Sequence, residues 1–130
     1  MTRESNDNAH SGSAIPPSEL PTLSSESDLL ARRHFESAYK QQQASNFDQA
    51  VAEYRQSIEA KHMFESFFNM GLCLRALERL QDAEAAFTRA ANLNRRYAPI
   101  YKQLSEVQKQ LGKDNEAQIA LSLYASLEKS

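Results

Sequence analysis

The sequence is poor in the residues that build covalent links, turns and chemical sites. Its 130 residues include one cysteine, no tryptophan, three glycines and four prolines. The single cysteine, Cys73, excludes an internal disulfide and fits a reducing compartment. No stretch approaches the roughly 20 apolar residues that span a bilayer, and the N-terminus lacks the basic start and apolar run of a signal peptide. These absences predict a cytoplasmic protein without direct membrane insertion.

Neither sign of charge is in excess. Lysine and arginine number 15 against 17 aspartate and glutamate residues, which gives a formal net charge of -2 and a pI near 5.9. Such a balanced chain has no global basic field to recruit nucleic acid. The basic doublets Arg32-Arg33 and Arg95-Arg96 are better interpreted as solvated or groove-edge residues than as a nucleic-acid footprint. We therefore expect no nucleic-acid partner.

Signals for catalysis and metal binding are also missing. His10, His34 and His62 do not form a metal set, and no pair of acidic residues has a fixed partner that suggests acid–base catalysis. There is no glycine-rich phosphate loop. Cys73 lies between two leucines, where we expect a small buried apolar residue rather than a nucleophile. The sequence predicts no enzyme, no metal and no cofactor.

Composition changes sharply after the first 28 residues. Residues 1–28 hold no aromatics, seven serines and three of the four prolines, with one basic residue against five acidic ones. Such a segment cannot bury enough apolar surface to offset its ordering entropy, so we predict a disordered tail that acts as a solubilising leader. The alternative is a short ligand segment, such as Ile15 or Leu20-Pro21-Thr22-Leu23, that binds in cis or in trans.

From Leu29 onward helix-forming residues dominate, and a pattern repeats. The alanines Ala50, Ala83 and Ala117 are separated by 33 and 34 residues. A large apolar residue follows each after four positions, a small residue precedes each by twelve, and a ring precedes each by sixteen. In chain order these sets are Tyr54, Phe87 and Leu121; Ala38, Gly71 and Ser105; and His34, Phe67 and Tyr101. A small residue facing an alanine lets two antiparallel helices approach closely. Because one hairpin cannot hide its own apolar faces, successive hairpins must stack.

The spacing predicts six helices in three hairpins. The expected ranges are 28–43 and 47–60, then 64–77 and 80–93, then 98–111 and 114–128. Turn signals fall between these ranges, and Pro99 suits the first turn of a helix, where its missing N–H costs nothing.

These residues resemble three tandem tetratricopeptide repeats (TPRs), at about 31–63, 64–97 and 98–130 within a domain at 29–130. The middle repeat matches the helix-packing positions of the family best, through Phe67, Met70, Gly71, Leu74, Ala83, Phe87 and Ala90. The first repeat departs from the pattern at His34, Ser37 and Gln41, where larger apolar residues are usual. The resemblance implies an all-α fold: a right-handed α-solenoid of three antiparallel helix hairpins.

The resemblance also implies a binding site, because the first helix of each repeat lines a concave, peptide-binding groove in this family. Carried over position by position, the groove residues are Arg32, Phe35, Tyr39, Gln42, Gln43, Glu65, Phe68, Asn69, Leu72, Arg75, Lys102, Gln103, Glu106 and Lys109. One part of this set, the apolar half, consists of Phe35, Tyr39, Phe68 and Leu72. Another part, the basic half, consists of Arg75, Lys102 and Lys109.

Two adjacent phenylalanines indicate which aromatic ring the groove exposes to a ligand. Phe67 and Phe68 cannot share one helix face, so we assign Phe67 to the core and Phe68 to the groove. Exposed aromatics on a concave surface favour a partner protein with an apolar anchor. The alternative is that the tail or a neighbouring subunit covers them. A chaperone C-terminal carboxylate is not expected as ligand, because only Asn69 matches the paired cations and asparagines that such a site needs.

The last predicted helix carries two apolar stripes where a surface helix needs one. Ala117, Ala120, Leu121 and Tyr124 fall on one face, and Ile119, Leu123 and Leu127 fall on another. Neither a further hairpin nor the polar capping helix common in this family follows here. We predict a second contact surface, used for self-association or a partner, formed by Ile119, Leu123, Tyr124 and Leu127. The alternative is a mildly apolar but solvated end.

The sequence thus predicts a non-enzymatic adaptor that binds a peptide or helical segment of another protein, with a homo-oligomer as a further expectation. Two alternatives remain open. One is a chaperone for translocators of bacterial type III secretion, whose second repeat the run FFNMGLCLRAL resembles. The other is a structural scaffold that self-assembles through its repeat ends.

Overall fold

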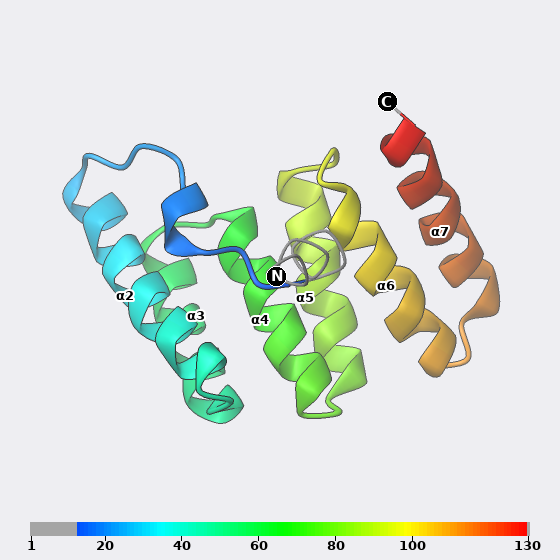
Figure 1. Cartoon of the computed structure of the whole chain (residues 1–130), viewed down its shortest axis with the longest axis horizontal. Helices are drawn as coiled ribbons and strands as arrows, with labels where there is room; N and C mark the ends of the chain where they lie inside the picture. Colours follow the sequence, from blue (N-terminus) through cyan, green and yellow to red (C-terminus); the bar gives the residue numbers. More distant parts are fainter. Residues whose placement is uncertain (1–12, 130) are drawn as a thin grey trace, which may run out of the picture.

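The computed structural model describes residues 13–129 of the chain. A short 3-10 helix, η1 (Pro17–Glu19), precedes six α-helices, and no strand occurs within the described range. The α-helices are α2 (Glu26–Gln43), α3 (Phe47–Ala60), α4 (Phe64–Ala76), α5 (Leu80–Leu93), α6 (Ala98–Gln110) and α7 (Asp114–Lys129). They pack in chain order as three hairpins that stack through α3 with α4 and α5 with α6 (Figure 1). The predicted all-α solenoid of helical hairpins is confirmed.

Small residues set the approach of the paired helices, as the repeat pattern predicts. A Cβ atom added to Gly71 of α4 would lie 2.6 Å from Cε1 of Phe87 in α5, so a larger residue there would force the helices apart. Ala38, Ala50 and Ala83 are fully buried at the corresponding contacts. The chain therefore uses small side chains where the helices meet and rings beside them.

All three hairpins turn in the same way. The residue after the cap of the first helix has a positive φ, and the next N–H reaches back over five residues to a helix carbonyl, which is the Schellman closure. The residues with positive φ are Ser45 (63°), Glu78 (63°) and Gly112 (80°). The closing bonds run from Asn46 to Gln41 (2.8 Å), from Arg79 to Leu74 (2.9 Å) and from Lys113 to Gln108 (2.8 Å). Only the third turn uses glycine, which adopts this conformation most readily.

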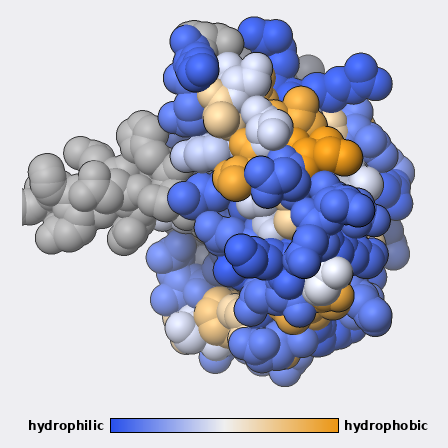
Figure 2. Space-filling model, turned by 90° about the vertical axis from the view of Figure 1, so that its right-hand side faces the viewer, coloured by the Kyte–Doolittle hydropathy of each residue, from blue (hydrophilic) through white to orange (hydrophobic). Residues whose placement is uncertain are grey.

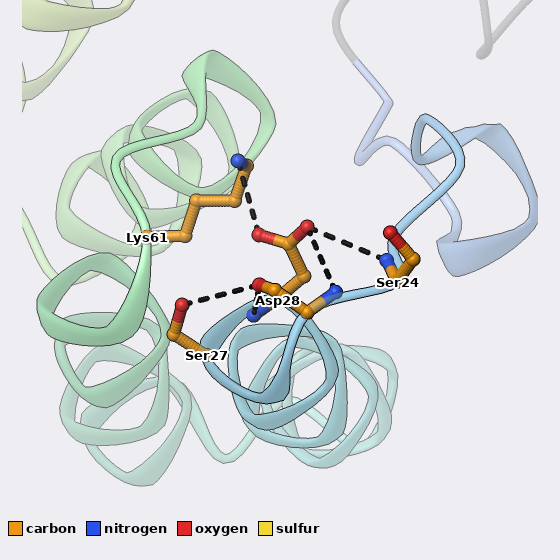
Figure 3. Close-up of polar contacts among 5 residues, drawn as sticks. Ser24, Ser27, Asp28 and Lys61 are labelled. Carbon is orange, nitrogen blue, oxygen red and sulfur yellow. Dashed lines mark hydrogen bonds and ion pairs between the residues drawn. The ribbon is translucent and has the colours of Figure 1, made fainter.

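The start of α2 is fixed by polar contacts (Figure 3). The Asp28 N–H donates to the Ser25 hydroxyl at 3.0 Å, and the Asp28 carboxylate accepts from the Ser25 N–H, which forms a capping box. The same carboxylate pairs with Lys61, after the end of α3, at 3.1 Å. This ion pair holds the pKa of Asp28 below its usual value. These contacts fix the point from which the preceding chain departs.

The described part of the tail differs from the predicted disorder. Residues 13–25 follow a defined path that includes η1, and Ile15 and Leu20 are buried in the main hydrophobic cluster. Two well-placed apolar side chains suffice here, although the average composition is polar. Residues 1–12, including His10, lie outside the described residues, so the prediction made for them stays a prediction.

Candidate functional site: a concave groove occupied by the chain itself

The N-terminal segment, defined here as residues 13–20, lies across the first helices of the first two hairpins. Figure 1 shows it running from the front of α4 towards α2 before the chain turns back into α2. Its η1 turn contacts α2, and the main chain of Ile15 is bonded to Asn69 of α4. This is the face on which the sequence predicts the peptide-binding groove.

Asn69 holds the N-terminal segment by its main chain. Its Oδ1 accepts from the Ile15 N–H at 2.8 Å, and its Nδ2 donates to the Ile15 carbonyl at 2.9 Å. The same Nδ2 lies 3.0 Å from the Tyr54 hydroxyl, which donates to Gln42 Oε1 at 2.6 Å. Asn69 is fully buried, so an unpaired amide there would be costly. Asn69 thus forms a two-point clamp on the main chain of Ile15.

Apolar burial accompanies the clamp. Ile15 is only 3% exposed, and Ile15 and Leu20 belong to the same buried cluster as Phe35 and Phe68. Full burial of an aliphatic side chain contributes about 1.5–3 kcal/mol. Pro16, between the two anchors, adopts φ -76° and ψ 158°, close to polyproline II geometry, which proline reaches at little entropic cost.

The apolar half is not exposed, which corrects the sequence-based expectation. Phe35 and Phe68 are both fully buried. The Phe68 ring meets Tyr97 edge-on at 5.5 Å and Phe87 at 5.7 Å, while Phe35 meets Tyr54 edge-on at 5.4 Å. The rings of Tyr54, Phe87 and Tyr97 therefore pack against Phe35 and Phe68. The N-terminal segment lies over the groove face of α2 and α4 (Figure 1). Of the two alternatives given for these aromatics, covering by the tail matches the structure.

The two remaining residues of the apolar half are partly accessible. Tyr39 and Leu72 are half-buried. Phe67, which the sequence assigns to the core, is also buried, and the Arg89 guanidinium lies 4.9 Å from its ring centroid. Adjacent Phe67 and Phe68 thus enter two different packing environments.

The basic half is only partly basic. Nη1 of Arg75 donates to Gln103 and Glu106, both at 2.7 Å, so its charge is largely compensated. The Lys102 ammonium lies 5.5 Å from the ring centroid of Tyr124, and Lys109 is exposed. These two lysines border a cleft of about 300 Å³ between α6 and α7. Its lining consists of Lys102, Ser105, Glu106, Lys109, Asp114, Ala117, Gln118 and Leu121.

Two of the remaining polar groove positions, Arg32 and Gln42, have local partners. Arg32 pairs with Glu36 one turn along α2 at 3.0 Å. Gln42 accepts the Tyr54 hydroxyl, as described, and Gln43 is exposed at the end of α2. Of these side chains, Gln42 joins the two helices of the first hairpin through Tyr54.

Glu65 is one of the predicted groove positions, and its burial was not expected from the sequence. It lies in the first turn of α4 and is only 7% exposed. Burial raises the pKa of its carboxyl, and the charge of Glu19 in η1 raises it further. Among residues 13–129 no cation forms an ion pair with Glu65. Glu65 is therefore a buried acid without an ion-pair partner among these residues, and the charge of the exposed Glu19 acts on it with the same sign.

The predicted surface on α7 divides into two parts. Ile119 is 63% exposed and Leu123 is 45% exposed, and a hydrophobic patch is visible on this end of the molecule (Figure 2). Leu127 is half-buried. Tyr124 lies against Lys102 of α6 and therefore belongs to the groove side of the helix.

Chemical sites other than a binding groove find little support in the described residues. No group of histidine, cysteine and acidic residues within 13–129 could hold a metal ion. No described helix is long and apolar enough to cross a membrane. Cys73 is fully buried, and burial raises the pKa of its thiol to about 12, which confirms the expected packing role.

Comparisons with known proteins agree with this geometry. Residues 64–97 match the tetratricopeptide repeat family, whereas no curated protein sequence matches the chain. The second TPR domain of Spaghetti (RPAP3), solved with a bound HSP90 peptide, is similar with a TM-score of 0.73 and 19% identity over 75% of this chain and 92% of that one. A mutant of MamA is similar with a TM-score of 0.70 and 21% identity over 75% of this chain and 72% of that one. Residues 64–97 thus match the tetratricopeptide repeat family, and the chain shares the fold of both solved neighbours.

Proposed function

We propose that the protein is a non-catalytic interaction module that binds an extended segment of another protein in its concave groove. The observation that carries this proposal is the Asn69 clamp on the main chain of Ile15. Main-chain hydrogen bonds do not depend on the ligand's side chains, so a partner segment of the same conformation can form them too. The N-terminal segment then acts as an internal ligand that a partner displaces.

The solved neighbour supports peptide binding in general, because the TPR domain of Spaghetti was solved with an HSP90 peptide. The details favour a different ligand for this chain. Asn69 grips the middle of a segment, and Arg75 is already engaged by Gln103 and Glu106. A free C-terminal carboxylate would find no converging cations. We therefore propose an internal segment with an apolar anchor.

A peptide titration with the full chain tests this function. The probe is a fluorescent peptide of residues 13–23, and the acceptor is the Ile15→Asp variant, whose own segment cannot bury a charge in the anchor site. We expect saturable binding to this variant. Much weaker binding is expected for the parent chain, because a short linker gives its own segment a millimolar effective concentration.

Two variants make the titration specific. Thr22→Asp changes an exposed residue of the same region and should behave like the parent chain. Adding Asn69→Ala to Ile15→Asp should abolish binding. No binding of the peptide to the Ile15→Asp variant at high micromolar concentration would overturn the proposed function.

We also propose self-association through the ends of the solenoid, on a separate observation. Ile119 and Leu123 are exposed on α7, and Leu29 and Leu30 are exposed on α2 at the opposite end. A contact between unlike ends is heterologous and leads to closed rings or open filaments. Sedimentation across a concentration series should show association that Leu123→Glu removes and Ser122→Glu, its exposed neighbour, preserves. A parent chain that stays monomeric at the highest concentration would rule this out.

A further inference from the structure

Building on the proposed function, we infer that the preferred partner segment repeats the apolar spacing of Ile15 and Leu20 and carries a cation where this chain has Glu19. That cation would face Glu65 in the groove. The partner is thus a protein segment that matches the internal ligand in shape and reverses its charge at one position.

The shape requirement follows from what the groove buries. Ile15 and Leu20, five residues apart, are both buried in the main cluster, while Ser18 and Glu19 between them are exposed. The intervening prolines lead into the η1 turn, whose Leu20 N–H closes on the Pro17 carbonyl at 3.1 Å. A competing segment must therefore present two aliphatic side chains at this spacing.

The charge requirement follows from the surroundings of Glu65. Glu65 is buried in the first turn of α4 at a predicted groove position, and no ion pair within the described residues includes it. Glu19 approaches from η1 with the same sign, and the phenol of Tyr97 approaches from the start of α6. Burial raises the pKa of Tyr97, and the charges of Glu19 and Glu65 raise it further. The carboxyl of Glu65 is thus buried without a counter-charge, and the exposed Glu19 adds a second negative charge in its surroundings.

The internal ligand is consequently a good fit in shape and a poor fit in charge. The covalent connection through residues 21–25 compensates for the poor fit in charge, because a segment that binds in cis loses no translational freedom. A partner lacks that advantage and needs a better contact to displace it. A cation opposite a buried, unpaired carboxylate is such a contact, because the charge pair forms in a partly desolvated site.

The test compares three fluorescent peptides on the full-length Ile15→Asp variant at low salt. The first has the sequence of residues 13–23, the second carries Glu19→Lys, and the third carries Ser18→Lys. Ser18 is exposed and adjacent, so the third peptide controls for the attraction of any cation to an acidic protein. We expect the Glu19→Lys peptide to bind about tenfold more tightly than the parent peptide, and the Ser18→Lys peptide to gain much less.

A second acceptor identifies the residue responsible. In the double variant Ile15→Asp, Glu65→Gln, the advantage of the Glu19→Lys peptide over the Ser18→Lys peptide should vanish. Equal gains for both lysine peptides, or an advantage that survives Glu65→Gln, would overturn the inference while parent-peptide binding upholds the groove. Failure of every peptide to bind would overturn the groove proposal as well.

Discussion

The two halves of the groove differ in what covers them. Around α2 and α4 the groove face carries aromatic rings and Asn69, and the N-terminal segment lies on it and buries Ile15. Around α6 and α7 the same kind of face carries lysines and acids, and a cleft of about 300 Å³ stays open. Three hairpins of one architecture thus form one occupied site and one solvated site. The repeat fixes the scaffold, and individual side chains decide where a ligand lies.

The contrast also separates two kinds of apolar residue. Phe68 in the occupied half contacts rings from α5 and from the start of α6, so it supports the solenoid as well as the site. Leu123 at the far end is 45% exposed, so little of the fold depends on it. The same substitution should therefore have very different effects at the two places.

The largest expected effect is a difference in stability between two single variants, one at Phe68 and one at Leu123. Phe68→Ala should lower the free energy of unfolding by about 3–5 kcal/mol, because it leaves a cavity between hairpins. Leu123→Ala should change it by less than about 0.5 kcal/mol. Chemical denaturation followed by circular dichroism measures both values. Similar losses for the two variants would remove the distinction between the halves.

A smaller effect is expected from removing the clamp. Asn69→Ala removes both hydrogen-bond partners of the Ile15 main chain and one of the two partners of the Tyr54 hydroxyl, which should cost about 1–3 kcal/mol. Asn92→Ala, at an exposed position of α5, is the control and should be neutral. Limited proteolysis should cut the segment preceding α2 faster in the first variant only. Equal cleavage of both variants would show that the clamp does not hold the segment.

The smallest effect is a pH dependence of the occupied half. The pKa of Glu65 is raised in the folded state, first by burial and then by Glu19, so its contribution to stability is present at low pH. That contribution is lost as pH rises through the folded-state pKa. Glu65→Gln should therefore be more stable than the parent by up to about 1 kcal/mol at pH 7, and the difference should close near pH 4. A constant difference across this range would contradict the account.

Asp28 should show a pH dependence of stability opposite to that of Glu65. The ion pair with Lys61 lowers its pKa, so its contribution is present above the unfolded-state value and is lost as pH falls through the folded-state value. Asp28→Asn should therefore lose stability relative to the parent at neutral pH and approach it in acid. The two variants should move in opposite directions in the same denaturation series.

The scaffold was predictable because its signals repeat. Separations of 33 and 34 residues between alanines placed all six helices within two residues of their observed ends, and Gly71 meets Phe87 as the pattern requires. The turns were harder to predict, because Ser45 and Glu78 adopt a positive φ where only Gly112 has the usual residue. In those two turns the Schellman bonds override the local preference.

The occupied half was only partly predictable. Composition averaged over residues 1–28 favoured a disordered tail over the alternative of a ligand segment that contains Ile15 or Leu20. The five-residue spacing of these two side chains matters only once a groove exists to receive them. Position in the repeat placed Asn69 and Phe68 on the groove face, but it gave no information on the rings of Tyr97 and Phe87 that enclose Phe68. The sequence analysis placed Tyr124 in the predicted contact surface of α7. It did not predict the contact of Tyr124 with Lys102, because that contact joins two different helices.

Hydrogen exchange of the Ile15 amide in the full-length protein tests the central claim most directly. This amide donates to a fully buried acceptor on Asn69 at 2.8 Å. The account predicts strong protection that Asn69→Ala removes and Asn92→Ala leaves intact. An Ile15 amide that exchanges in the parent chain as fast as in an unstructured peptide would contradict it.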